Sequence, residues 1–352
     1  MTALLCLLLM VTLAACGQTT TAPTRTPART TVVITPAASR AKPAIFFGTA
    51  VQYQLLQTDL QYRRIASDKF NLLTPENDMK FGVIEQRQGT FDFARADAIM
   101  TFARANGLWL RGHTLVWGQD LPDWLVNGHF TRQQTIDILK TYILTVVGHF
   151  KGQVIAWDVV NEALDGSQLK NNFWLQTIGP EYIPLAFEWA HQTDPQTALF
   201  YNDWGDDEIG PKFDATLSMI NTLRSQGAHV DGVGMETHIG FGSVFRPEDV
   251  VTNMARLKAA GLDVEVSEMD VQLGGLPGDS NTKLQEQANI FGQVAAICKA
   301  AGNCRSFTVW GVCDRYTWLS QIVTSPQQPL LFDVNYQPKP AYAAVVKALG
   351  GA

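Results

Sequence analysis

The chain lacks the features that mark several large classes of protein. Its 352 residues carry 27 basic and 33 acidic side chains, a net charge of -6, so there is no basic surface of the kind that binds nucleic acid. The six histidines show no metal-ligand spacing, and no glycine-rich phosphate loop follows any apolar run. No Ser/His or Cys/His nucleophile arrangement is present. We therefore expect no metal, no cofactor and no nucleic-acid partner.

The N-terminal 16 residues form an apolar run that is too short to cross a bilayer. The run ends in small residues, as a secretory signal does, and LAAC (13–16) resembles a lipobox whose cysteine is acylated. Residues 17–42 are dominated by Thr, Ala and Pro, which predicts a disordered linker. We expect an extracytoplasmic protein, secreted or held at the cell surface by a lipid on Cys16, with membrane contact only through that lipid.

Three further cysteines lie near the C-terminal end. Cys298 and Cys304 flank a Gly-Asn helix stop, and in an exported protein we expect a disulfide to close this small loop. Cys313 would then be a lone, buried thiol without reactivity.

From residue 43 to 350, short apolar runs alternate with stretches whose apolar residues recur at helical spacing. Continuous apolar strands between helices indicate parallel strands covered on both faces. Eight such units in about 300 residues predict a single α/β domain, a (β/α)8 or TIM barrel. An open doubly wound sheet is the alternative, which the missing phosphate loop disfavours. The eight runs cover 44–51, 70–77, 108–117, 154–163, 198–204, 230–239, 262–270 and 306–312.

Two glutamates stand at the ends of apolar runs, Glu162 in WDVVNEA (157–163) and Glu268 in VEVSEMD (264–270). A carboxylate at the end of a buried strand is costly unless a site needs it. Glycoside cleavage needs one protonated carboxyl at the leaving oxygen and one carboxylate at the anomeric carbon. The two glutamates end the fourth and seventh predicted strands, so we expect them to face each other about 5–5.5 Å apart, the geometry of retaining enzymes.

Eight motifs occur in order along the predicted barrel. They are TPENDMKF (74–81), RGHTLVW (111–117), WDVVNEA (157–163), YNDW (201–204), GVGMETHI (232–239), EVSEMD (265–270), TVWGVCDRYTWL (308–319) and LLFDVNYQPKPAY (330–342). On these motifs the chain resembles glycoside hydrolase family 10, the endo-β-1,4-xylanases. The resemblance covers about residues 44–348 and implies a TIM barrel that hydrolyses xylan with retention of configuration.

The resemblance implies a role for each matching position. Glu162 is the acid/base, Glu268 is the nucleophile, and Asn161 holds the 2-hydroxyl of the reacting sugar. His238 hydrogen-bonds near the nucleophile, and Asp270 orients it. The family disulfide matches Cys298 and Cys304. The other implied sugar-binding residues are Glu76, Asn77 and Lys80 for the next sugar on the non-reducing side, His113 for the reacting sugar, and Trp117, Trp310 and Trp318 as aromatic walls.

The chain departs from the family pattern close to the site. Glu236 stands where the family usually has a Gln that donates a hydrogen bond to the nucleophile, and an ionised Glu would instead repel Glu268. We expect Glu236 to carry a proton in the working enzyme, so that activity falls as pH rises. A Glu236→Gln variant should then move the alkaline limb of the pH–activity profile to higher pH, and an unmoved limb would contradict this.

Gly118-Gln119-Asp120 stands where the family usually has a His and a Gln, so the chain lacks a histidine and an amide beside the second glycone subsite.

Other departures are Phe81 in place of Trp and Trp204-Gly205 in place of Tyr-Asn.

The sequence thus predicts a monomeric endo-β-1,4-xylanase acting on xylan or xylo-oligosaccharides, with a signal segment (1–16), a linker (17–42) and a catalytic domain (43–350). Two alternatives remain open. One is a related retaining β-glycanase with shifted specificity, for example an exo-acting enzyme. The other is a non-catalytic surface protein that binds polysaccharide.

Overall fold

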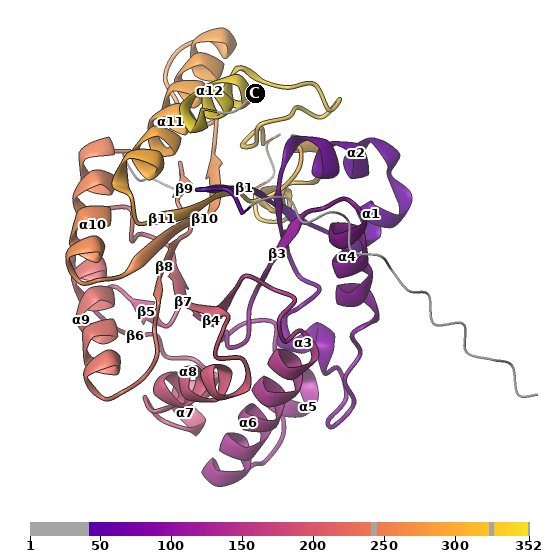
Figure 1. Ribbon diagram of the computed structural model, residues 1–352, viewed down its shortest axis with the longest axis vertical. Coiled ribbons are helices and arrows are strands. Elements are labelled where there is room, and N and C mark those ends of the chain that lie inside the picture. The colour runs from indigo at the N-terminus through magenta and orange to yellow at the C-terminus, as the bar shows by residue number, and fades with distance from the viewer. Residues whose placement is uncertain (1–41, 241–244, 324–326, 351–352) are drawn as a thin grey trace, which may run out of the picture. The chain divides into compact units, whose positions relative to one another are not determined.

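The computed structural model describes residues 42–350 except 241–244 and 324–326. Eight parallel strands form a closed barrel, because they hydrogen-bond in the order β11-β1-β2-β3-β4-β7-β8-β10 and β10 also pairs with β11. Figure 1 shows these strands in the centre and the helices around them. The strands are β1 (Phe46–Val51), β2 (Leu72–Pro75), β3 (Trp109–Gly112), β4 (Ala156–Asn161), β7 (Ala198–Asp203), β8 (Gly232–Met235), β10 (Asp263–Val271) and β11 (Cys304–Val309).

The predicted TIM barrel is therefore confirmed, and each of the eight apolar runs overlaps one barrel strand. The strands are buried almost throughout, since helices cover their outer faces. The helices are α1 (Tyr53–Thr58), α2 (Leu60–Lys69), α3 (Phe81–Ile84), α4 (Ala94–Ala105), α5 (Asp123–Val126), α6 (Arg132–His149), α7 (Phe173–Thr177), α8 (Tyr182–Thr193), α9 (Pro211–Ser225), α10 (Pro247–Ala259), α11 (Ser280–Ala301) and α12 (Pro340–Leu349).

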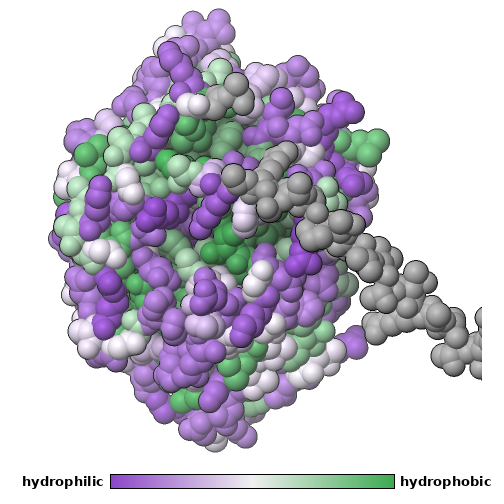
Figure 2. Space-filling model, in the orientation of Figure 1, coloured by the Kyte–Doolittle hydropathy of each residue, from purple (hydrophilic) through white to green (hydrophobic). Residues whose placement is uncertain are grey.

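Helix boundaries follow ordinary capping chemistry. Thr131 and Gln134 form a capping box at the start of α6, in which each side chain accepts from the other residue's backbone N–H. Gly302 ends α11 in the left-handed conformation, at φ 77°, which a residue without Cβ adopts at no steric cost. On the face seen in Figure 2, hydrophilic residues dominate the outer ring, and hydrophobic ones show mainly towards the middle. No helix within the described residues is long and apolar enough to cross a membrane.

Several predicted strands are shorter than expected, and two of the differences place site residues. The run 108–117 forms a regular strand only to Gly112, so His113 already lies beyond the strand end. The run 230–239 breaks after Met235, because Thr237 takes a positive φ of 57°. The chain then resumes as β9 (His238–Ile239), which pairs with the end of β10 through Asp270. The break separates Glu236 from the barrel strand and lets His238 approach β10.

Cys298 and Cys304 form the predicted disulfide, six residues apart, between the end of α11 and the start of β11. Cys313 is free and buried, as expected, and burial raises the pKa of its thiol to about 11. Replacing both bridged cysteines by serine should lower the free energy of unfolding by about 2 kcal/mol, the loop-closure entropy of so short a loop. Chemical denaturation of the double variant and the wild type under oxidising conditions measures this. Equal midpoints would show that the bridge does not stabilise the fold.

The predicted signal segment, linker and lipidated Cys16 lie outside the described residues.

Two short strands, β5 (Leu164–Asp165) and β6 (Gln168–Leu169), form an antiparallel hairpin directly after β4. This hairpin brings Lys170 back beside the end of β4, where the site is built.

Candidate active site

A cleft of about 910 Å³ lies at the carboxyl ends of the barrel strands. In this fold those ends, with the loops that follow, carry the functional side chains. The predicted catalytic and sugar-binding residues number twelve, including the three tryptophans of the predicted walls. The lining residues are Glu76, Asn77, Lys80, His113, Trp117, Gln119, Asp120, Asn161, Glu162, Trp204, Gly205, Asp207, Glu208, Glu236, His238, Glu268, Trp310, Trp318, Gln321 and Ile322.

All twelve of these residues lie in the lining, so the fold brings the complete predicted set together in one cleft. They come from segments that are far apart in the sequence, between residues 76 and 318. Asp270, predicted to support His238, is fully buried behind the lining. Gln119 and Asp120, from the segment that departs from the family pattern, also face the cleft.

Glu162 directly follows β4 and has a positive φ of 49°, which turns its side chain out of the strand. Its backbone N–H donates to the carbonyl of Asn202 at 2.9 Å, which fixes this turn against β7. Its carboxylate accepts from Nζ of Lys170 at 2.9 Å, and the side chain keeps 14% of its surface exposed. Glu162 is thus a solvent-reachable carboxylate held at one edge of the cleft.

Glu268 lies within β10 and is 5% exposed. Its Oε1 accepts from Nδ2 of Asn202 at 2.7 Å, and its Oε2 lies 3.5 Å from Nε2 of His238. Burial alone would raise the pKa of Glu268, but the contact with His238 and the nearby His113 outweigh burial and lower it. The arrangement therefore favours an ionised Glu268, as a nucleophile requires.

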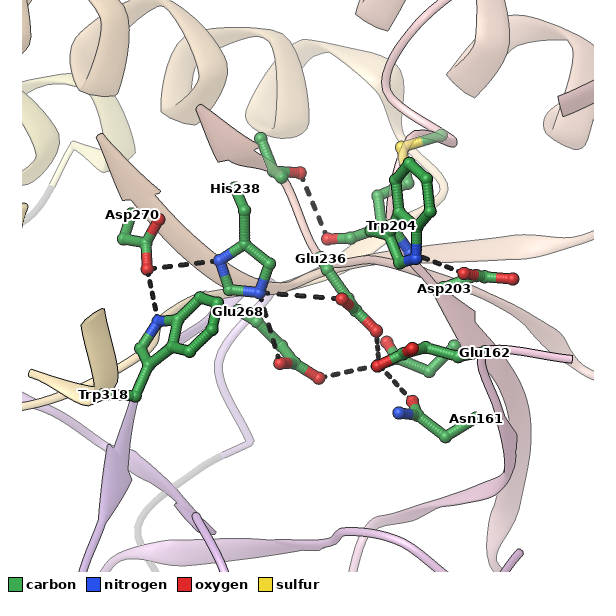
Figure 3. A network of polar contacts seen from close by, with 12 residues as sticks. Asn161, Glu162, Asp203, Trp204, Glu236, His238, Glu268, Asp270 and Trp318 are labelled. Atoms are coloured by element: carbon green, nitrogen blue, oxygen red, sulfur yellow. Dashed lines mark hydrogen bonds and ion pairs between the residues drawn. The ribbon is translucent and has the colours of Figure 1, made fainter. Parts of the chain in front are cut away.

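His238 is held from its far side by Asp270 and Trp318 (Figure 3). Its Nδ1 lies 3.2 Å from Oδ2 of Asp270, and the same oxygen accepts from Nε1 of Trp318 at 2.8 Å. Burial would lower the pKa of His238, but Asp270 and the carboxylates of the cleft outweigh it and raise the pKa well above the usual value. Nε2 is consequently directed at Glu236 and Glu268.

Glu236 faces Glu268 across the amide of Asn202, which donates to Oε1 of Glu236 at 3.1 Å. Burial, followed by the charges of Glu268 and Glu162, raises the pKa of Glu236 well above the usual value. The two neighbouring carboxyls are therefore shifted in opposite directions, which favours a neutral Glu236 beside an ionised Glu268. This direction agrees with the protonated Glu236 expected above, and the pH profile of the Glu236→Gln variant stays a prediction.

The glycone side of the cleft is built around Lys80. Its Nζ donates to Oδ1 of Asn77 at 2.8 Å, lies 3.3 Å from Oδ2 of Asp120 and stands 4.7 Å from the ring centre of Trp117. Glu76 is buried, and burial raises the pKa of its carboxyl. Asp120 thus supplies a partner for Lys80 from the segment where the chain departs from the family pattern.

Three parts of the site were not predicted. Asn202 lies in the motif YNDW (201–204), but its contacts with Asn161, Glu236 and Glu268 were not predicted. The register places Asn202 opposite Gly234, where a Cβ would come within 2.1 Å of Oδ1 of Asn202. No pattern in the sequence points to Lys170, which reaches Glu162 only through the β5–β6 hairpin.

The third unpredicted part is a buried charge cluster beneath the cleft. Arg111 forms ion pairs with Asp158 and Glu265, and Asp158 also holds Nδ1 of His113 at 2.9 Å. All of these side chains are at most 2% exposed. Each charged residue interrupts a predicted apolar strand, and that interruption is the signal that could have revealed the cluster. The cluster fixes His113, whose ring packs edge-on against Trp310 with centroids 5.0 Å apart.

Comparisons with known proteins agree with this geometry. Residues 37–348 match the family described as Glycosyl hydrolase family 10. The chain is 37% identical over 307 residues to Endo-1,4-beta-xylanase 1 of Humicola insolens, which covers 86% of this chain and 71% of that protein. It is 37% identical over 288 residues to Endo-1,4-beta-xylanase B of Thermotoga neapolitana, covering 81% and 82%.

Among solved structures, the chain is similar to xylanase 10B from Thermotoga petrophila RKU-1 in complex with xylobiose. The TM-score is 0.83 at 36% sequence identity, and the match covers 87% of this chain and 94% of that one. The family match spans nearly all of the barrel and every residue of the cleft named above. The chain therefore belongs to glycosyl hydrolase family 10.

Proposed function

We propose that this protein is an endo-1,4-β-xylanase that cleaves xylan with retention of configuration, Glu268 being the nucleophile and Glu162 the acid/base. One observation carries the assignment of roles: Glu162, just after β4, and Glu268, within β10, line the same cleft in different surroundings. Glu162 is partly exposed and is hydrogen-bonded by Lys170, whereas Glu268 is buried and its pKa is lowered. The relatives of this family named above act on xylan or hold xylobiose.

The first step forms a glycosyl-enzyme. An oxygen of Glu268 attacks the anomeric carbon while the glycosidic C–O bond breaks, and Glu162 donates its proton to the leaving oxygen. In the second step Glu162 removes a proton from water, the hydroxide oxygen bonds to the anomeric carbon, and the bond to Glu268 breaks. Two inversions at the same carbon give net retention, and Glu162 ends the cycle protonated again.

Polar residues around Glu162 and Glu268 position the two carboxylates for these two steps. Asn202 donates to Glu268 and to Oδ1 of Asn161, so it fixes the nucleophile and leaves the NH2 of Asn161 free to face a sugar hydroxyl. Lys170 pairs with the ionised form of Glu162, the form that the second step needs. His113 and His238 stand on either side of Glu268 and stabilise its negative charge.

The walls of the cleft suit an uncharged, polyhydroxylated chain. Trp117, Trp310 and Trp318 offer ring faces to sugars, and Lys80 with Asn77 offers donors and acceptors for hydroxyls. The lining includes residues that follow β2, such as Lys80, and residues that follow β7, such as Trp204 and Glu208. An endo-acting enzyme needs sugar contacts on both sides of its two catalytic carboxylates. We assign Glu76, Asn77 and Lys80 to the non-reducing side, as the family pattern implies.

A time course of product release from β-1,4-xylan tests the function. An endo-acting enzyme releases a ladder of xylo-oligosaccharides that shortens with time, whereas an exo-acting relative releases one small product from the start. Binding to insoluble xylan without release of any oligosaccharide by the folded wild type would instead support the non-catalytic alternative and overturn the proposal.

We also propose that the protein acts outside the cytoplasm, anchored by a lipid on Cys16 and held off the membrane by residues 17–42. The support is the composition of the N-terminal segment and its LAAC sequence. Cells that express the full chain should incorporate labelled fatty acid into it, and a Cys16→Ser variant should not. Equal labelling of both proteins would contradict the anchor.

A further inference from the structure

We propose that Glu236, His238 and Glu268 form a binding site for one divalent cation of the Zn²⁺ type, and that a cation bound there inhibits the enzyme. The inhibition rests on the proposed function, because it assumes that Glu268 is the nucleophile. The binding itself does not, because it follows from three side chains and their geometry.

The spacing of the three side chains fits a small metal ion. One atom from each residue lies within 4.8 Å of the other two. Nε2 of His238 is 3.5 Å from Oε2 of Glu268 and 3.6 Å from Oε2 of Glu236. Metal–ligand bonds of about 2.0–2.2 Å at tetrahedral angles place ligand atoms about 3.3–3.6 Å apart. These two separations match two edges of a zinc tetrahedron and are long for hydrogen bonds, and the ligand oxygens of Glu236 and Glu268 lie within 4.8 Å of each other.

A second observation is that the two carboxylate oxygens of Glu236 are not equally hydrogen-bonded. Glu236 is 4% exposed, yet no hydrogen bond from the described residues reaches its Oε2, since Asn202 donates only to Oε1. Among the described residues, His238 is the only basic side chain within 4.0 Å of the Glu236 carboxylate, and its Nε2 lies 3.6 Å from Oε2. Glu268, 5% exposed, adds a second carboxylate on the same side. Two buried carboxylates that converge on one imidazole nitrogen are costly together unless a proton or a cation lies between them.

The surroundings already hold the ligands in place. Asp270 contacts Nδ1 of His238, which is the carboxylate–histidine arrangement that supports metal-binding imidazoles. Trp318 donates to the same oxygen of Asp270 and restrains it. Asn202 restrains both carboxylates through their Oε1 atoms. The Oε2 atoms of Glu236 and Glu268 both face Nε2 of His238 (Figure 3).

The donor set and the setting select the kind of ion. One imidazole nitrogen and two carboxylate oxygens suit Zn²⁺ and its neighbours in the first transition row, whereas Ca²⁺ takes six to eight oxygens and Mg²⁺ keeps an octahedral shell. The three residues line the open cleft, so a water or a sugar hydroxyl can complete the coordination. An ion there would hold the carboxylates of Glu236 and Glu268 and block the attack of Glu268 on the anomeric carbon.

The site depends on the departure at position 236. The family pattern places Gln there, and a neutral amide offers one weak oxygen ligand and no charge. Sensitivity to Zn²⁺ at this site should therefore be a property of this chain that a Glu236→Gln substitution removes. A matched control is Glu208→Gln, because Glu208 lines the same cleft but is not one of the three ligands.

Calorimetric titration of the tag-free full chain with Zn²⁺ tests binding without any substrate. We expect one ion per chain in the wild type and in Glu208→Gln, and binding at least about tenfold weaker in Glu236→Gln. A His238→Asn variant should show the same loss. Circular dichroism confirms that each variant is folded. Equal binding by the wild type and Glu236→Gln, or no binding by the wild type, would overturn the site.

Xylan hydrolysis over a range of Zn²⁺ concentrations then tests inhibition, with each variant compared with its own rate in a chelator. The Zn²⁺ concentration for half inhibition should rise at least about tenfold in Glu236→Gln and stay unchanged in Glu208→Gln. Zn²⁺ that binds at the three residues without slowing hydrolysis would overturn the inhibitory role. A protein that does not hydrolyse xylan fails the proposed function, and the calorimetric result then judges the metal site by itself.

Discussion

Replacing Glu268 by alanine should lower kcat/KM for xylan on the order of 10⁴- to 10⁶-fold, because the variant loses the ionised carboxylate that forms the glycosyl-enzyme. The loss should fall on kcat rather than KM, since Glu268 acts on the reacting carbon and the walls that bind the chain remain. Initial rates of reducing-sugar release over a range of xylan concentrations measure both constants.

Added azide separates loss of the nucleophile from general damage to the fold. With an activated aryl xylobioside, azide should enter the space left by the Glu268 side chain and give the α-glycosyl azide, a single inversion. Asn202 and His238, which contact Glu268, remain in the variant and keep the space polar. A Glu268→Ala enzyme that retains more than a few per cent of the wild-type rate would refute the assignment.

Replacing Glu162 by alanine should lower kcat/KM for xylan by about 10²- to 10⁴-fold, the usual contribution of a general acid. Xylan has a poor leaving group, so its cleavage needs the proton that Glu162 supplies. An aryl xylobioside with a good leaving group needs no such proton, and its first step should lose far less. Rapid-quench kinetics with the aryl substrate should show a burst of released phenol followed by slow turnover, since water has lost its base.

The matched control for Glu162 is Lys170→Met, which removes the partner of the carboxylate but keeps the carboxylate itself. Azide should accelerate turnover of the aryl substrate by Glu162→Ala and yield the β-glycosyl azide, the opposite product from that of Glu268→Ala. Equal losses on xylan and on the activated substrate, or the same azide anomer from both variants, would contradict the division of roles.

Much of the fold could be predicted because the barrel repeats one physical pattern. Apolar runs buried on both faces alternate with amphipathic helices, and each of the eight runs overlaps a barrel strand. Strand ends were less predictable. The run around His113 continues with Leu115, Val116 and Trp117 beyond the strand end at Gly112, and the break at Thr237 depends on a backbone angle that hydrophobicity does not encode.

The predicted site residues meet in one cleft because they follow strand ends, which a barrel gathers at one mouth. The contacts between them were not predictable to the same degree. Asn202 bridges Asn161, Glu236 and Glu268 through the relative register of β4, β7 and β8, which only pairing between strands reveals. Lys170 reaches Glu162 because a short hairpin folds back, and a lysine in a loop carries no sequence signal of such a contact.

The identity of the residue that bonds to the sugar is the central claim, and trapping that bond tests it most directly. A 2-deoxy-2-fluoro-xylobioside with a good leaving group should glycosylate the enzyme quickly and release slowly, because the fluorine destabilises the oxocarbenium-like transition states and the leaving group offsets this in the first step. Proteolysis and mass spectrometry should then find the fluoroxylobiosyl mass on Glu268. The same mass on Glu236, or an unlabelled enzyme that still hydrolyses xylan, would contradict the account.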